Sequence, residues 1–157
     1  MSKRQYWLMK SEPYAYSIDD LEKDQVEPWD GIRNYEARNF MRDDMKVGDG
    51  ILFYHSNVKP PVIVGTMEVA SEPYPDPTQF DPDSKYFDKK SSEEDPTWQL
   101  VDVKFVQKFK EPVTRDAIKE ESALQDMTLL KRIRLSITPV TEEEWNKIHE
   151  MAGAKAI

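Results

Sequence analysis

The feature that most constrains the fold of this chain is the irregular order of its short apolar segments. Five segments have the composition of β-strands, at residues 6–9, 50–54, 62–70, 100–109 and 135–140. Short helical patterns lie between them, without the strand–helix alternation of a doubly wound sheet. A small barrel with helices at its rim is the compact solution, because closing a sheet removes its edges. The sequence therefore predicts an α+β fold built on a small β-barrel.

Two of the expected helices begin with a capping signal, in which a hydroxyl is followed three residues later by an acid: Ser17 with Asp20, and Thr141 with Glu144. A third helix is expected over residues 33–45. A fourth is expected to start near Thr114, where good helix formers follow.

The composition excludes several classes of site. The 157 residues fit one domain, so we expect a single unit over residues 1–157. No apolar run approaches the ~20 residues that span a bilayer, and no apolar stretch follows the basic start, so we expect no membrane segment and no signal peptide. The chain has no cysteine, which excludes disulfides and zinc–thiolate sites and is consistent with a cytoplasmic location. It also lacks a phosphate-binding glycine loop and a calcium loop, so we expect no metal and no cofactor.

The net charge of −8 weighs against binding to nucleic acid, because phosphate contacts need a basic surface. The charge is unevenly spread, however. Residues 68–95 hold nine acids and three bases, a net charge of −6, which leaves −2 for the rest of the chain. A local basic face is therefore compatible with the remainder. The acidic segment also holds four prolines and several aromatic residues, which favours an ordered loop.

Polar residues follow two of the predicted strands directly. The first strand ends in Lys10, Ser11 and Glu12 and is stopped by Pro13. Strand ends at the mouth of a barrel are suitable places for polar groups to meet a ligand, although a solvated turn is the other interpretation.

The second strand to end in this way is the one over residues 50–54, which is followed by His55, Ser56 and Asn57. A histidine invites a catalytic interpretation, but no nucleophile, base and orienting group are apparent in the sequence. A structural, hydrogen-bonded role for His55 is favoured.

The third polar group lies on the predicted helix over residues 33–45. Asn34, Arg38 and Arg42 recur every four residues and would share one helix face, with Asn39 beside them. Arginine suits phosphate and asparagine can pair with base edges, while Trp29 before the helix offers a flat surface for stacking. An ordinary amphipathic helix with Trp29 in the core remains equally open.

Several stretches together resemble the EVE domain family, in order from about Gln5 to about Ile148. They are Tyr-Trp-Leu-Met-Lys-Ser-Glu-Pro at 6–13, Trp-Asp-Gly-Ile-Arg-Asn-Tyr-Glu-Ala-Arg-Asn-Phe-Met-Arg at 29–42, Phe-Tyr-His-Ser-Asn at 53–57, Tyr-Pro-Asp-Pro-Thr-Gln-Phe at 74–80, Pro-Thr-Trp at 96–98 with Val-Asp-Val-Lys-Phe at 101–105, and Leu-Ser-Ile-Thr-Pro-Val at 135–140. The resemblance implies a PUA-like pseudo-barrel, similar to the YTH readers of methylated adenine. It also implies a partner that is DNA or RNA carrying modified bases, such as 5-methylcytosine. The single-domain form is similar to stand-alone bacterial members.

The resemblance implies that a flipped-out base is held between the strand mouth and the adjacent helix. The matching residues are Lys10, Ser11, Glu12, Pro13, Trp29, Arg33, Asn34, Arg38, Asn39, His55, Ser56 and Asn57. Trp29 would stack on the base, the asparagines and Ser11 would read its edge, and Lys10 and the arginines would neutralise phosphates. Two departures from the family pattern weaken phosphate contact: Glu36, where glutamine is frequent, and Thr97, where arginine is common.

Two other functions stay open beside this non-enzymatic one. The acidic segment over residues 68–95 suits a protein-interaction module with a basic partner. A base-processing hydrolase would use Glu12 or Asp30 as its acid–base residue.

Overall fold

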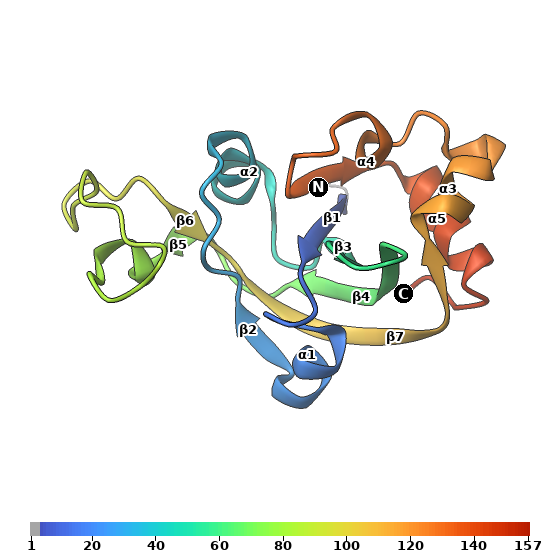
Figure 1. Ribbon diagram of the computed structural model, residues 1–157, viewed down its shortest axis with the longest axis horizontal. Coiled ribbons are helices and arrows are strands. Elements are labelled where there is room, and N and C mark those ends of the chain that lie inside the picture. Colours follow the sequence, from blue (N-terminus) through green and yellow to red (C-terminus); the bar gives the residue numbers. More distant parts are fainter. Residues whose placement is uncertain (1–3) are drawn as a thin grey trace.

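The protein is described by a computed structural model over residues 4–157, and its centre is a curled six-stranded sheet (Figure 1). The strands are β1 (Tyr6–Ser11), β2 (Val26–Pro28), β3 (Gly50–His55), β4 (Val62–Val69), β7 (Asp102–Thr114) and β8 (Ile137–Val140), in the order β2-β7-β4-β3-β1-β8. Only β1 and β3 pair in parallel, and the other neighbours are antiparallel. The predicted α+β class with a small pseudo-barrel and flanking helices is confirmed.

The sheet bends strongly along β4 and β7. The pairing register of β4 shifts against both of its neighbours close to Gly65. A side chain at Gly65 would collide with the backbone carbonyl of Gln107, so the close approach of β4 and β7 at the bend requires glycine. The bend leaves β2 and β8 as the two edges of an open half-barrel.

Helices cover both faces of the sheet: α1 (Ile18–Asp24), α2 (Tyr35–Asn39) with a π-helical turn η1 (Phe40–Asp44), α3 (Arg115–Glu120), η3 (Ser122–Leu124), α4 (Thr128–Lys131) and α5 (Glu142–Met151). Both predicted capping boxes are confirmed, at the starts of α1 and α5. Thr114 caps α3, as predicted. No helix within residues 4–157 is long and apolar enough to cross a membrane.

The helix predicted over residues 33–45 begins later than expected. Asn34 is its N-cap, and the Asn34 side chain accepts a hydrogen bond from the backbone N–H of Ala37. The second half is π-helical, which changes the angular spacing of its side chains. The prediction that Asn34 lies within this helix is therefore wrong, and so is the regular α-helical spacing expected between Arg38 and Arg42.

Alternation along β1 and β3 divides the core into two clusters. Trp7, Met9 and Phe53 pack with residues of α1 and α2. Leu8 and Leu52 point to the other face and pack with residues of α3 to α5. Consecutive residues at the ends of these strands therefore face opposite sides of the sheet.

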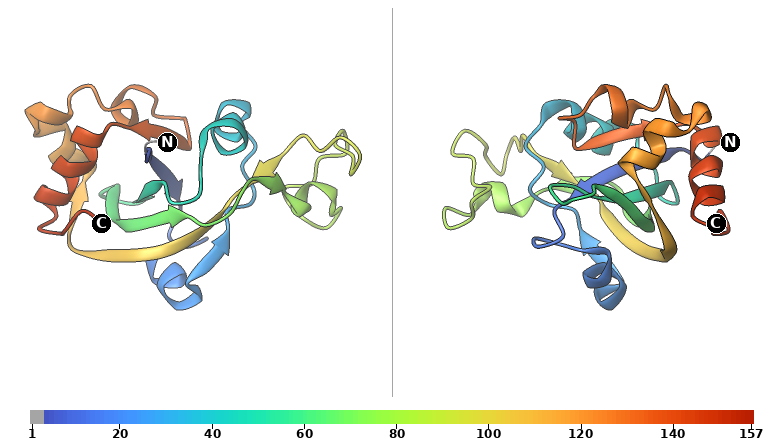
Figure 2. Two further views of the ribbon diagram at one scale, coloured as in Figure 1. Left: turned by 180° about the vertical axis from the view of Figure 1, so that it is seen from behind. Right: turned by 45° about the vertical axis from the view of Figure 1, so that its right-hand side comes forward.

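A lobe projects from one side of this body, on the side away from α3 and α5 (Figures 1 and 2). It is built on the two-residue strands β5 (Tyr74–Pro75) and β6 (Gln99–Leu100), which pair with each other, and on the 3-10 helix η2 (Pro77–Phe80). The side chain of Gln79 is buried in it and donates to the backbone carbonyls of Asp76 and Trp98. The segment predicted to be an ordered loop is thus ordered around its own buried polar core.

The five predicted strands are confirmed, with β7 running five residues further than expected and β8 starting two residues later. The short strands β2, β5 and β6 were missed by the sequence analysis. With two or three residues each, they are too short to show an alternating pattern.

Candidate functional site

A cleft of about 1170 Å³ lies at the carboxyl ends of β1 and β3. Because these strands are parallel, both end at the same edge of the sheet, with Ser11 beside His55. The lining residues come from the segments at the two edges of the half-barrel, from the β3–β4 turn, from the start of α3 and from the lobe: Lys10, Ser11, Glu12, Ala15, Tyr16, Glu27, Pro28, Trp29, Asp30, Gly31, Ile32, Tyr54, Ser56, Asn57, Val58, Lys59, Pro61, Lys85, Tyr86, Arg115, Leu129, Ile133, Arg134 and Ser136. The cleft therefore occupies the opening that the unclosed sheet leaves.

The structure brings six of the predicted site residues together at this cleft: Lys10, Ser11, Glu12, Trp29, Ser56 and Asn57. The other six are not among its lining residues: Pro13, Arg33, Asn34, Arg38, Asn39 and His55.

Trp29 belongs both to the core and to the cleft wall. Only 7% of its surface is exposed, and it packs edge-on against Phe53 and Tyr16 at ring-centroid distances of 5.5 and 6.3 Å. Its backbone N–H donates to the carbonyl of Val101, the residue between β6 and β7. The two interpretations of Trp29 from the sequence are thus compatible, because a core side chain lines the cleft.

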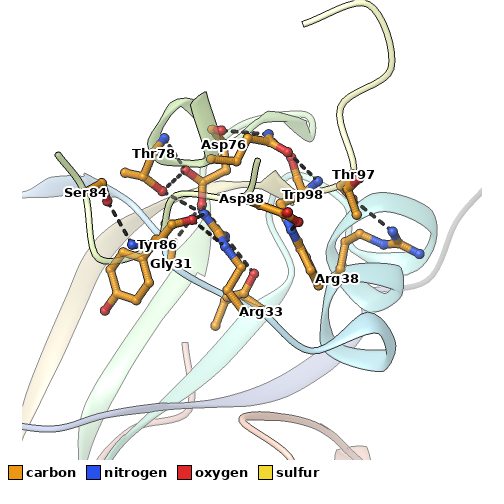
Figure 3. Close-up of polar contacts among 12 residues, drawn as sticks. Gly31, Arg33, Arg38, Asp76, Thr78, Ser84, Tyr86, Asp88, Thr97 and Trp98 are labelled. Carbon is orange, nitrogen blue, oxygen red and sulfur yellow. Dashed lines mark hydrogen bonds and ion pairs between the residues drawn. The ribbon is translucent and has the colours of Figure 1, made fainter. Parts of the chain in front are cut away.

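The guanidinium of Arg33 is fully engaged with the protein (Figure 3). It donates to the backbone carbonyls of Ile32 and Tyr86, to the hydroxyl of Thr78 and, at 3.1 Å, to the carboxylate of Asp76. It also lies between two aromatic rings, 5.5 Å from the centroid of Tyr86 and 5.3 Å from that of Trp98. Arg33 therefore fastens the lobe to the body, and these bonds leave its predicted phosphate contact without a free donor.

The residues of α2 brace the lobe in the same way (Figure 3). Arg38 donates to the backbone carbonyl of Thr97 at 2.9 Å and to the side-chain oxygen of Asn39. Tyr35 stacks on Trp98 with centroids 4.9 Å apart, and Arg38 lies over the Tyr35 ring. The predicted contacts of Arg38 and Asn39 with nucleic acid stay a prediction.

His55 has the structural role that the sequence favoured. Its Nε2 accepts a hydrogen bond from the backbone N–H of Ile18 at 3.2 Å, which requires an unprotonated nitrogen. Burial lowers the pKa of His55, so the neutral form is favoured. The ring thus ties the start of α1 to the end of β3.

The polar residues at the rim of the cleft hold each other in place. The hydroxyl of Ser11 donates to the backbone carbonyl of Tyr16 at 2.6 Å, and the amide of Asn57 donates to the carboxylate of Glu12 at 2.9 Å. The Ser11 hydroxyl and the Asn57 side-chain carbonyl keep acceptor capacity for a ligand.

The cleft is basic although the protein is acidic. Its lining includes five cationic side chains, Lys10, Lys59, Lys85, Arg115 and Arg134, against three carboxylates, Glu12, Glu27 and Asp30. This is the local basic face that the uneven charge of the sequence allowed. Arg115 was not among the predicted site residues, because it lies at the start of α3 and only the fold brings it near β1. Among residues 4–157, no three potential metal ligands cluster together.

Two of the carboxylates, Glu27 and Asp30, flank Trp29 in the sequence and line the cleft with it. Burial raises the pKa of Glu27, and the charge of Asp30 adds to it. Burial also raises the pKa of Asp30, with a further contribution from Asp76. Both groups are thus easier to protonate than free carboxylates, a property typical of binding and catalytic sites.

The raised pKa of Asp30 predicts that Asp30→Asn stabilises the protein at neutral pH. The folded state binds this proton more tightly than the unfolded state, so stability falls as the pH rises from the ordinary value of 3.8 through the folded pKa. Since Asp30 is exposed, solvent screening limits the gain to less than about 1 kcal/mol. Urea unfolding of both proteins at pH 7 and at pH 3 measures it. The gain is expected at pH 7 and not at pH 3, whereas Asp83→Asn in the lobe is expected to change little. A lower free energy of unfolding in Asp30→Asn at pH 7 would contradict the raised pKa of Asp30.

The chain matches one family model and several known proteins. The model of the EVE domain matches residues 5–151. Thymocyte nuclear protein 1 of mouse is 44% identical over 162 residues, which cover 91% of this chain and 71% of the mouse protein. The human protein of the same name is 42% identical over 160 residues, with 90% and 71% covered.

Solved structures share the whole fold. A hypothetical protein from Leishmania major has a TM-score of 0.93 and 47% identity, with 96% of each chain covered. The human THYN1 protein in complex with DNA that contains 5-methylcytosine has a TM-score of 0.90 and 39% identity, with 96% of this chain and 99% of the human one covered. On the family match and on these identities, the chain belongs to the EVE domain family.

Proposed function

We propose that this protein is a non-enzymatic reader that holds one modified base, flipped out of a nucleic acid, in the cleft. The observation that carries the proposal is a basic cleft with an aromatic wall on a protein whose net charge is −8. The human relative solved with DNA that contains 5-methylcytosine makes that base the first candidate.

The walls of the cleft suit the parts of a flipped base. Trp29 and Tyr16 offer aromatic surface, and stacking on such surface contributes ~1–3 kcal/mol per base, which offsets part of the cost of unstacking. The carboxyl groups of Glu27 and Asp30 suit the exocyclic amino group of cytosine or adenine, which donates hydrogen bonds. When protonated, either group also donates to the adjacent ring nitrogen.

A methyl group adds little to binding by burial alone. One buried methyl contributes ~0.8 kcal/mol, which corresponds to roughly fourfold in affinity. A larger preference for the modified base needs an unfavourable contact with the unmodified one.

The experiment is fluorescence anisotropy with the full chain at low and moderate salt. The panel holds single- and double-stranded DNA and RNA of one sequence, each with cytosine, 5-methylcytosine, 5-hydroxymethylcytosine, adenine or N6-methyladenine at one position. We expect one modified base to bind about fourfold or more tightly than its unmodified form, with the single strand at least equal to the duplex because unpairing costs a few kcal/mol. Equal, weak binding across the panel would contradict the proposal.

The raised pKa of Asp30 keeps a hydrolase as a second candidate, since a general acid needs such a group. Glu12 is less suited to act as the general acid because its carboxylate accepts a hydrogen bond from the amide of Asn57. Release of a free base from the modified oligonucleotide, lost in Asp30→Asn, would favour this enzyme over the reader.

The projecting acidic lobe favours a third candidate, a docking surface for a basic protein. Most of the net −6 of residues 68–95 lies on this lobe, which projects from the body of the protein. Weak binding across the nucleic-acid panel would favour this docking surface over the base reader. The cytoplasmic location stays a prediction, since the mammalian relatives carry "nuclear" in their name.

A further inference from the structure

We infer that the cleft orients a nucleotide in one direction, with a phosphate group held by Lys10, Tyr54 and Arg115. This inference rests on the proposed function and assigns one end of the cleft to the phosphate.

The three residues meet on one face of the sheet. Lys10 and Tyr54 are partners across the parallel strands β1 and β3, and the Lys10 ammonium lies 5.9 Å from the centroid of the Tyr54 ring. Arg115 reaches this place because its backbone N–H bonds to the carbonyl of Pro61, at the start of β4. All three residues line the cleft.

The cations at this end lack a carboxylate partner. Lys10 donates to the backbone carbonyl of Ile133 at 2.9 Å, and no ion pair joins Lys10 or Arg115 to an acid within residues 4–157. The Nε of Arg115 is buried without a hydrogen-bond partner in the described part of the chain. A buried donor without a partner points to a group that is absent from the free protein.

The charge balance at this end favours an anion. Burial, together with the charge of Arg115, lowers the pKa of Lys10, so the two cations disfavour each other in the free protein. The charge of Asp116 contributes to the raised pKa of Tyr54, but Asp116 forms no ion pair with Arg115 in the described part of the chain. Burial also raises the pKa of Tyr54, which keeps its hydroxyl as a neutral donor. A phosphate between these groups would accept their hydrogen bonds and relieve the repulsion.

The side of the cleft at Trp29 has a different character. Trp29 packs in the core cluster of α1 and α2, whereas Tyr54 packs in the cluster of α3 to α5, so the two rings lie on opposite faces of the sheet. Glu27 and Asp30 are close to Trp29 in the chain and line the cleft with it, and their carboxylates repel a phosphate. A nucleotide has the same polarity, with an anionic phosphate and, in cytosine and adenine, an amino group that donates hydrogen bonds. The orientation that matches both sides places the base at Trp29 and the phosphate at Arg115.

The test is calorimetric titration of the full chain with four ligands: 5-methyldeoxycytidine, its 5′-monophosphate, a dinucleotide in which an internal phosphodiester follows the modified nucleoside, and inorganic phosphate. We expect the monophosphate to bind about tenfold tighter than the nucleoside, because charge-assisted hydrogen bonds form only with the phosphate. Comparison with the dinucleotide shows whether a backbone phosphodiester increases the affinity over the nucleoside as much as a terminal phosphate does.

Variants separate this site from a general charge effect. In Arg115→Gln, we expect the tenfold ratio to fall to about twofold or less, whereas Arg115→Lys retains part of it. Lys110→Gln removes one positive charge from an exposed position on β7 outside the cleft, and is expected to leave the ratio at the wild-type value. With a single-stranded oligonucleotide, Arg115→Gln also lowers the slope of log affinity against log salt by about 0.7.

The outcomes distinguish the inference from the proposed function. If the nucleoside binds and the phosphate adds nothing, the phosphate site is wrong and the base reader stands. If the nucleoside fails to bind while inorganic phosphate binds and requires Arg115, the base reader is wrong and the anion site stands. If neither phosphate nor the monophosphate binds, the inference is overturned.

Discussion

Replacing Asp76 with alanine is expected to lower the free energy of unfolding by about 3 to 5 kcal/mol and to weaken ligand binding, although Asp76 does not line the cleft. Its carboxylate is fully buried and accepts four hydrogen bonds: from the Arg33 guanidinium, from the backbone N–H of Gly31, and from the backbone N–H and hydroxyl of Thr78. Without the carboxylate, the Arg33 charge loses its counter-ion where only 21% of that side chain is exposed. Urea unfolding measures the loss.

The effect on binding follows from Gly31. A side chain at this position would lie 2.7 Å from the Tyr86 ring, and its backbone has a φ of +81°, so only glycine fits between Asp30 and the lobe. Asp76 fixes the Gly31 N–H, and Arg33 fixes the Tyr86 carbonyl, so this one cluster positions the part of the cleft wall that Gly31 and Tyr86 form. Asp83→Ala, which removes an exposed carboxylate from the same lobe, is the matched control and is expected to change stability by less than about 0.5 kcal/mol. If Asp76→Ala and Asp83→Ala change the free energy of unfolding and the ligand affinity equally, the role of the Arg33–Asp76 ion pair in holding the lobe is refuted.

Replacing Trp29 with alanine is expected to have the largest effect on base binding. Loss of stacking corresponds to roughly 5-fold to 150-fold in affinity for the preferred oligonucleotide, from ~1–3 kcal/mol per base. Because Trp29 is also a core residue, the same change is expected to cost about 3 to 5 kcal/mol in stability. Anisotropy at a temperature where the variant is folded, verified by circular dichroism, measures binding alone.

Two variants separate stacking from stability. Met41→Ala destabilises the same core cluster by about 2 to 5 kcal/mol but lies outside the cleft lining, so its affinity for the oligonucleotide is expected to stay at the wild-type value. Trp29→Phe keeps an aromatic face and is expected to retain more binding than Trp29→Ala. Unchanged affinity in a folded Trp29→Ala would exclude Trp29 as the stacking surface.

Features that depend on neighbouring residues were predicted well. The strand patterns, the capping boxes of α1 and α5 and the cap at Thr114 each need only a few consecutive residues, so they can be read from the chain. The strand ends at Ser11 and Asn57 were placed in the site for the same reason, because polar residues directly follow buried strands.

The roles of the arginines could not be predicted, because a guanidinium is free or engaged only relative to distant partners. Arg33 has the residue type of a phosphate contact, yet Asp76 and Tyr86 come from a segment more than forty positions away and occupy its donors. Arg115 has no motif around it, yet the fold leaves its buried Nε without a partner beside Lys10.

The sequence alone determined the longer strands and the capped helices, and that a basic face could exist on an acidic chain, because periodicity, capping and net charge are properties of the residues in order. The tertiary structure decided where that face lies and which residues make it. The curl of the sheet at Gly65 leaves the two edges apart, and the parallel pair β1 and β3 ends in that opening. The ion pair between Arg33 and Asp76 then holds the lobe beside the cleft. Each of these depends on contacts between residues far apart in the chain, which hydrogen-bond geometry and close packing set only once the chain is folded.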